Sequence, residues 1–125
     1  MRHKKILIFD EGRFAKVCNA LLQLDGYVPE HIVQVQELKK LANFKNFDLI
    51  ITSYPYGVDV LDRLKNKDIP VVVLSDCVDN DLLNCLKKIK TSFCMIKPVD
   101  FSKFSKIIKT IMTKKMERAL GYEIL

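Results

Sequence analysis

The sequence lacks several features that identify common functional classes at once. Its 125 residues contain no tryptophan, two histidines and only four glycines. No Cys-x-x-Cys pair, and no cysteine close to a histidine, occurs among Cys18, Cys77, Cys85 and Cys94. The sequence therefore predicts neither a zinc site nor a disulfide framework, and we expect the cysteines to be small core residues.

Long apolar runs are also missing. No stretch approaches the roughly 18 consecutive apolar residues that a membrane-spanning helix needs. The basic start, Met1 to Lys5, is followed by only four apolar residues before Asp10, which is too short for the core of a signal peptide. We expect a cytoplasmic protein with no membrane partner.

A glycine-rich phosphate loop is absent as well. The segment that follows the first apolar run, Glu11-Gly-Arg-Phe, offers a single glycine. Nucleotide and flavin sites in related folds rely on several glycines there, because the backbone must approach a phosphate closely. The sequence thus argues against a nucleotide-dependent or flavin-dependent enzyme.

The charge is basic but not concentrated in one tract. The net charge is +6 and the pI is near 9.2, which leaves a nucleic-acid-binding module as one alternative. No recognition motif accompanies this charge, and Phe101 and Phe104 fit the apolar stripe of a helix better than a stacking platform. We interpret the scattered lysines as a solvated surface, so that nucleic acid is not the expected partner.

What the sequence does contain is a regular alternation of short apolar runs and helical patterns. With 49% hydrophobic residues, residues 1–125 suffice for one domain. We expect its core to run from about residue 5 to 112, and residues 113–125 to form a helical extension or tail. Asp79 and Asp100 are candidate helix caps. Pro29 places its strand at a sheet edge. The predicted strands are Lys5–Phe9, Tyr27–Val33, Asp48–Ser53, Val71–Leu74 and Phe93–Ile96.

Five strands alternating with five helices predict a doubly wound α/β fold with a five-stranded parallel sheet. Such sheets carry their functional sites at the carboxyl ends of the strands. Polar residues mark the carboxyl ends of four of the five strands, and we expect them to meet at one edge: Asp10, Glu11, Ser53, Ser75 and Lys97.

Three short motifs give this pattern a family resemblance. They are Ile-Phe-Asp10-Glu11, Val-Leu-Ser75 and Met-Ile-Lys97-Pro98. From about Lys5 to Met112 the chain resembles the receiver domain of bacterial two-component response regulators. The resemblance implies a flavodoxin-like (βα)5 fold with strand order 2-1-3-4-5. It also implies a phosphoryl-accepting aspartate after the third strand, Mg²⁺ held by the acidic pair, and a hydroxyl and a lysine that contact the phosphoryl oxygens.

The main departure from that family is Ser53, which stands where the phospho-acceptor aspartate is expected. An alcohol attacks phosphorus efficiently only after a base removes its proton, and we interpret His3 and His31 as ordinary surface histidines. We therefore predict a pseudo-receiver that is not an enzyme. The loop after the third strand is shorter than usual, Asp76 replaces a small residue, and Cys94 stands where a switch aromatic is common.

The remaining polar residues give two further expectations. With one anionic ligand lost, a Mg²⁺ site on Asp10 and Glu11 should be weak or lost, so we predict no required cofactor. Lys97, deprived of its usual partner, is expected to form an ion pair with Asp10 or Glu11 across a smaller pocket.

Without phosphoryl chemistry, function is expected to lie in contacts with a protein partner such as a histidine kinase or an output protein. The resemblance points to the face made by the fourth and fifth helices and the fifth strand. Its lysines would favour an acidic partner. They are Lys87, Lys88, Lys90, Lys103, Lys106 and Lys109.

Two alternatives remain open. The chain could still respond to phosphorylation or Mg²⁺ through a non-standard site. The apolar end, with Tyr122, Ile124 and Leu125, could dock on a second subunit and form a homodimer.

Overall fold

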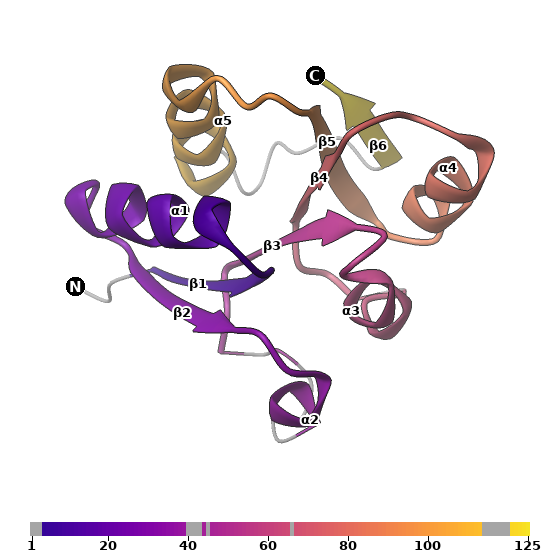
Figure 1. Cartoon of the computed structure of the whole chain (residues 1–125), viewed down its shortest axis with the longest axis horizontal. Helices are drawn as coiled ribbons and strands as arrows, with labels where there is room; N and C mark the ends of the chain where they lie inside the picture. Colours follow the sequence, from indigo (N-terminus) through magenta and orange to yellow (C-terminus); the bar gives the residue numbers. More distant parts are fainter. Residues whose placement is uncertain (1–3, 40–43, 45, 66, 114–120) are drawn as a thin grey trace.

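A six-stranded parallel sheet lies at the centre of the computed structural model, which describes residues 4–39, 44, 46–65, 67–113 and 121–125 (Figure 1). The strand order is β2-β1-β3-β4-β5-β6. The predicted doubly wound α/β fold and the order of its first five strands are confirmed. The strands are β1 Lys5–Phe9, β2 Val28–Ile32, β3 Leu49–Tyr54, β4 Val71–Ser75, β5 Thr91–Ile96 and β6 Gly121–Ile124.

Helices cover both faces of this sheet. On one face lie α1, Arg13–Leu24, and α5, Phe101–Thr113. The other face carries α2, Val35–Leu38, with α3, Val58–Arg63, and α4, Asn80–Lys87 (Figure 1). Parallel strands need such crossover helices, because the chain must return to the same end of the sheet before each new strand.

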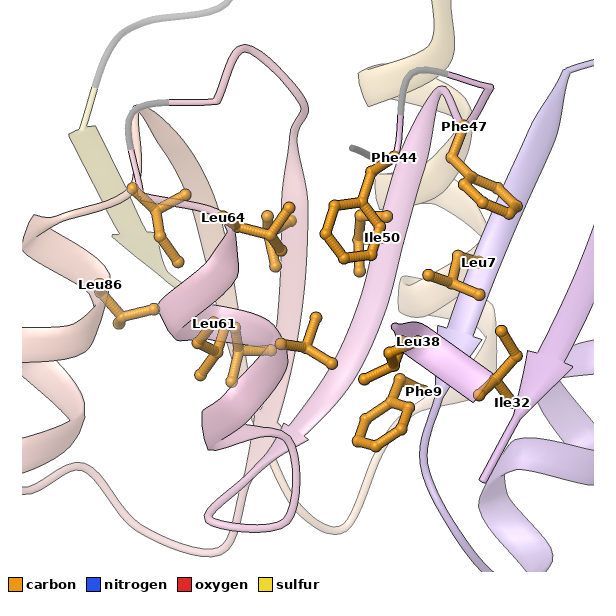
Figure 2. Packing of buried hydrophobic residues seen from close by; sticks show 14 of the residues in the cluster. Leu7, Phe9, Ile32, Leu38, Phe44, Phe47, Ile50, Leu61, Leu64 and Leu86 are labelled. Carbon is orange, nitrogen blue, oxygen red and sulfur yellow. The ribbon is translucent and has the colours of Figure 1, made fainter. Parts of the chain in front are cut away.

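The sheet separates two hydrophobic clusters, and the alternation of side chains along each strand explains the separation. Leu7 and Phe9 of β1 pack with α2, α3 and α4 in the first cluster (Figure 2). Ile6 and Ile8 of the same strand pack with α1 and α5 in the second cluster. Successive side chains of a strand point to opposite faces, so a strand buried on both faces must be apolar throughout.

The predicted edge strand and both predicted caps are found in the structure. Pro29 lies in β2, which pairs only with β1, so its missing N–H costs no ladder bond on the open side. The Asp79 carboxylate accepts a hydrogen bond from the Leu82 N–H at 2.8 Å. The Asp100 carboxylate accepts from the N–H groups of Ser102 and Lys103 at 3.0 and 3.2 Å. These bonds fix the starts of α4 and α5.

The end of the chain differs from the expected helical extension or tail. Gly121–Ile124 forms β6, a sixth parallel strand that pairs with β5. The helical part of the prediction falls largely on residues 114–120, which lie outside the described residues. The alternation of Tyr122 and Ile124 is the one sequence signal for this strand, and it is too short to have predicted it. Among the described residues, no helix is long and apolar enough to cross a membrane.

The cysteines divide into buried and accessible thiols. Cys18 and Cys94 are fully buried, as predicted, whereas Cys77 is exposed, so the prediction of a core residue is wrong there. Cys85 is half-buried. Burial raises the pKa of the Cys18 thiol, with a further contribution from the charge of Asp10, and burial alone raises the pKa of Cys94.

Thiol labelling should therefore be selective in the native protein. Alkylating reagents attack the thiolate, which is scarce in a buried thiol whose pKa is raised. We expect iodoacetamide at neutral pH to modify Cys77 first, while Cys18 and Cys94 react only after unfolding. Peptide mass spectrometry after timed labelling measures this order. Labelling of Cys18 at the rate of Cys77 would contradict the packing of α1.

Candidate functional site

The centre of the candidate site is a hydrogen bond between the ends of β1 and β3. The Ser53 hydroxyl donates to Oδ1 of Asp10 at 2.7 Å, and both residues are only 4% exposed. Phe9 of β1 is paired with Thr52 of β3, which brings the next residue of each strand together. The two adjacent strands thus place a neutral donor directly against a buried carboxylate.

A second hydrogen bond reinforces this junction. The Thr52 hydroxyl donates to the backbone oxygen of Phe9 at 2.7 Å, and Thr52 is fully buried. It binds the end of β3 to the end of β1 on the side opposite Ser53. Both strand ends are therefore held by side-chain bonds as well as by the ladder.

The turn after β3 is unusually tight. Only residues 55–57 separate β3 from α3, and the Gly57 N–H donates to the Ser53 oxygen at 2.7 Å. A Cβ atom on Gly57 would lie 1.8 Å from the Thr52 hydroxyl oxygen and 2.7 Å from the Ser53 backbone oxygen. Position 57 therefore requires glycine because the backbone approaches β3 too closely for any side chain.

Tyr56 covers one side of the site, which the sequence did not indicate. Its ring stacks on Phe9 with a centroid distance of 5.2 Å, and its hydroxyl donates to the backbone oxygen of Val33. Burial raises the pKa of Tyr56, and the charges of Glu11 and Asp10 raise it further. The ring thus links the turn to the loop after β2, beside the acidic pair.

His31 also belongs to the surroundings of the site, contrary to its interpretation as a surface residue. It is half-buried on β2, and its Nε2 lies 2.7 Å from the backbone oxygen of Asp10. The bond reaches the main chain of Asp10 and not the Ser53 hydroxyl, so His31 positions the strand end and does not act as a base for Ser53. His3 lies outside the described residues.

Ser75 and Lys97 are joined through the backbone, whereas the Ser75 side chain bonds within its own loop. The Ser75 hydroxyl, buried at the end of β4, donates to the Cys77 oxygen at 2.7 Å. The Lys97 N–H donates to the Ser75 oxygen at 2.9 Å. Ser75 is paired with Tyr54 and not with Ser53. The five predicted residues thus share an edge, but their side chains form no single network.

The predicted ion pair of Lys97 with Asp10 or Glu11 is wrong. Within the described part of the chain, Lys97 forms no such pair, and the Asp10 carboxylate accepts its hydrogen bond from Ser53. The reason is distance across the sheet, since β3 and β4 separate β1 from β5. A serine hydroxyl on the adjacent strand satisfies the buried carboxylate without movement of a long side chain.

The same geometry tests whether a divalent cation fits. Asp10 is buried and already accepts from Ser53, while Glu11 is exposed. No group of three or more potential ligands from histidine, cysteine, aspartate and glutamate occurs among the described residues. Mg²⁺ prefers several carboxylate and water oxygens in an octahedral arrangement. At these strand ends, Asp10 and Glu11 are the acidic side chains that would hold such an ion together with water.

The predicted switch and partner residues have different environments. Asp76 is exposed and lies next to Cys77. Cys94 is buried on β5, where it is paired with Ile124 of the adjacent strand β6. All the predicted lysines of the partner face are exposed. They are Lys87, Lys88 and Lys90 at the end of α4, and Lys103, Lys106 and Lys109 on α5.

A small groove lies away from these strand ends, between α3 and α4. Its volume is about 110 Å³, and its lining includes Val58, Leu61, Cys85 and Lys88. An ion pair between Asp62 and Lys65, at 2.7 Å, lies on its rim. None of the predicted strand-end residues lines this groove.

The fold is similar to solved structures of response-regulator receivers. A response regulator from Thermotoga maritima superposes with a TM-score of 0.72 and 22% sequence identity, covering 90% of this chain and 100% of that one. A two-component response regulator from Clostridium difficile gives 0.72 at 17% identity, covering 90% and 98%. The chemotaxis response regulator CheY4 of Vibrio cholerae gives 0.71 at 18% identity, covering 88% and 99%.

Similarity is confined to structure. No protein-family model matches the sequence, and no curated protein matches it significantly. The chain therefore has the receiver fold, and the chemistry of its site has to be argued from its own residues.

Proposed function

We propose that this protein is a receiver-like signalling module that acts through protein contacts and is not switched by phosphorylation. The observation that carries the proposal is the Ser53 hydroxyl, buried and donating to Asp10 at 2.7 Å. A phospho-acceptor must present a nucleophile to solvent, whereas Ser53 is a residue only 4% exposed.

The chemistry of the pair supports the same conclusion. An alcohol needs a base to become nucleophilic, and carboxylates are weak bases toward alcohols. A phosphoryl group that approached Ser53 would also meet the negative charge of Asp10. In this proposal no divalent cation is held there to neutralise that repulsion.

The pair also supports a fixed conformation. Asp10 and Ser53 satisfy each other, Thr52 is bonded to Phe9, and Gly57 is bonded to Ser53. Each of these bonds joins elements that would have to move for the strand ends to rearrange. In this proposal the sheet edge is a rigid support for contacts made elsewhere on the surface.

The partner is proposed to be an acidic protein surface in a signalling pathway. The exposed lysines at the end of α4 and along α5 give the proposed partner face a positive charge. Complementary charge accelerates the encounter of two proteins and selects between partners. Catalysis is not part of the proposed role.

Phosphoryl transfer tests the proposal directly. The full chain is incubated with acetyl phosphate and Mg²⁺, and intact mass is followed with Ser53→Ala as the matched control. We expect no phosphoryl adduct on either protein. A stable phosphoserine at position 53, or an acid-labile adduct on Asp10, would refute the proposal and favour a receiver with a non-standard site.

A further inference from the structure

The edge of β5 is occupied by the chain's own last residues. The Gly121 N–H donates to the Lys90 oxygen at 2.6 Å, and the Leu125 N–H donates to the Cys94 oxygen at 2.8 Å. Between these bonds, β6 runs parallel to β5 with Ser92 opposite Tyr122 (Figure 1). Strand addition of this kind is a general way for an extended peptide to bind a sheet edge.

β6 is held mainly by its backbone. All four of its residues are exposed, including Tyr122 at 38% and Ile124 at 40%. The half-buried Leu125 is its apolar anchor, packed against the second hydrophobic cluster. A strand that buries so little apolar surface belongs to the least stable parts of a fold and opens locally at low cost.

One buried polar group of β5 has no partner within the described part of the chain while β6 occupies the edge. The Ser92 hydroxyl, on a residue 1% exposed, is buried without a hydrogen-bond partner among the described residues. It lies on the strand that β6 covers, opposite Tyr122. A buried hydroxyl without a partner costs free energy that a better-fitting occupant would recover.

The surroundings of this edge are basic. β6 begins beside Lys90, and Lys87 and Lys88 are exposed at the end of α4. An extended segment that entered here in the direction of β6 would place its first residues near these lysines. Acidic residues at that position would be favoured.

We propose that the β5 edge is a docking site for an extended segment of a protein partner, and that β6 is an internal occupant which that segment displaces. The partner segment runs parallel to β5, places an aliphatic side chain at the position of Leu125, and carries acidic residues ahead of it. This inference rests on the proposed function, because displacement of β6 takes the place of phosphorylation as the control of access.

Two full-length variants and a peptide test the inference. The probe is fluorescein-labelled Glu-Glu-Gly-Tyr-Glu-Ile-Leu, in which two glutamates precede the sequence of residues 121–125. Leu125→Asp removes the apolar anchor and frees the edge. Ile124→Cys places a thiol opposite Cys94, so that oxidation locks β6 in place. Glu123→Gln serves as the control variant, and circular dichroism verifies folding.

Fluorescence anisotropy should show at least tenfold tighter binding of the peptide to Leu125→Asp than to the wild type or Glu123→Gln. Oxidised Ile124→Cys should bind no peptide, and reduction should restore binding. A peptide that begins Lys-Lys should bind more weakly than the one that begins Glu-Glu.

Three results would overturn the inference: equal affinity of Leu125→Asp and the wild type, undiminished binding to oxidised Ile124→Cys, or no binding to any variant. Equal binding of the two peptides would overturn the acidic partner. If Leu125→Asp fails to fold, the oxidised and reduced forms of Ile124→Cys decide alone. None of these measurements uses a phosphoryl donor. A negative result would therefore reject the docking site without rejecting the proposal that phosphorylation does not switch the protein.

Discussion

Replacing Gly57 by alanine is expected to lower the free energy of unfolding by about 3 to 5 kcal/mol. The new Cβ would lie 1.8 Å from the Thr52 hydroxyl oxygen and 2.7 Å from the Ser53 backbone oxygen. Neither atom can retreat freely, because Thr52 donates to Phe9 and the Ser53 oxygen accepts from Gly57 itself. Relief of the clash therefore breaks a buried hydrogen bond at the junction of β1 and β3. Urea unfolding followed by circular dichroism measures the loss.

A matched control is available in Gly26→Ala. Gly26 has a φ of 89° but nothing within 4 Å of the added Cβ, so only backbone strain of about 1 kcal/mol is expected. Thr52→Ala provides a second test, since it removes the atom that clashes most closely. The double variant should be less destabilised than the sum of the two single variants. Equal losses of unfolding free energy for Gly57→Ala and Gly26→Ala would show that the turn at Gly57 has room for a Cβ atom.

The fold was predictable because its signals are local and repeated. Each central strand contains a short apolar run, as in Val71 to Leu74, which burial on both faces explains. Pro29 could be assigned to an edge, and Asp79 and Asp100 to helix starts, because each assignment follows from a single backbone requirement. The sixth strand was missed because its four residues include a glycine and bury little, so the apolar pattern is short.

The site was predictable in position but not in its contacts. Parallel topology brings Asp10, Ser53 and Ser75 to one edge, whatever their partners are. Which side chains form hydrogen bonds depends on the register of neighbouring strands and on the distance that each side chain can span, and a sequence contains neither. Ser53 reaches Asp10 from the adjacent strand, whereas Lys97 would have to cross two strands. Tyr56 was overlooked and His31 was assigned to the surface for the same reason, since their contacts with Val33 and Asp10 join distant parts of the chain.

Replacing Ser53 by aspartate is expected to destabilise the protein in the absence of metal and to make its stability depend on Mg²⁺. The change puts a second carboxylate where a hydroxyl now donates to Asp10 at 2.7 Å. Two buried like charges at this distance cannot both be accommodated without a counterion. Without metal, we expect a loss of about 2 to 4 kcal/mol at neutral pH and a melting temperature lower by about 10 °C.

The pH dependence of this loss has a definite sign. Repulsion and burial should raise the pKa of the introduced carboxyl in the folded protein above its value in the unfolded chain. The folded variant then binds more protons than the unfolded one as the pH falls. The stability difference from the wild type should therefore shrink as the pH is lowered from 7 to 5, and grow again on return to pH 7.

Mg²⁺ should offset the loss of stability caused by Ser53→Asp. With Asp10, Glu11 and the introduced carboxylate, the strand ends would offer three acidic oxygen ligands, the kind of set that a hard cation prefers. We expect 10 mM Mg²⁺ to raise the melting temperature of Ser53→Asp by several degrees and to leave the wild type unchanged, which differential scanning fluorimetry can measure. Ser53→Asn, similar in shape but neutral, should show neither the loss nor the rescue.

The variant with the added carboxylate is also the one in which phosphoryl acceptance becomes chemically reasonable, because a carboxylate is a nucleophile without deprotonation. We expect acetyl phosphate and Mg²⁺ to form an acid-labile adduct on Ser53→Asp and none on the wild type. This result would identify Ser53 as the residue that prevents phosphoryl transfer to the site. A wild type that Mg²⁺ stabilises as strongly as Ser53→Asp would contradict this, because it would mean that Asp10 and Glu11 already bind the ion.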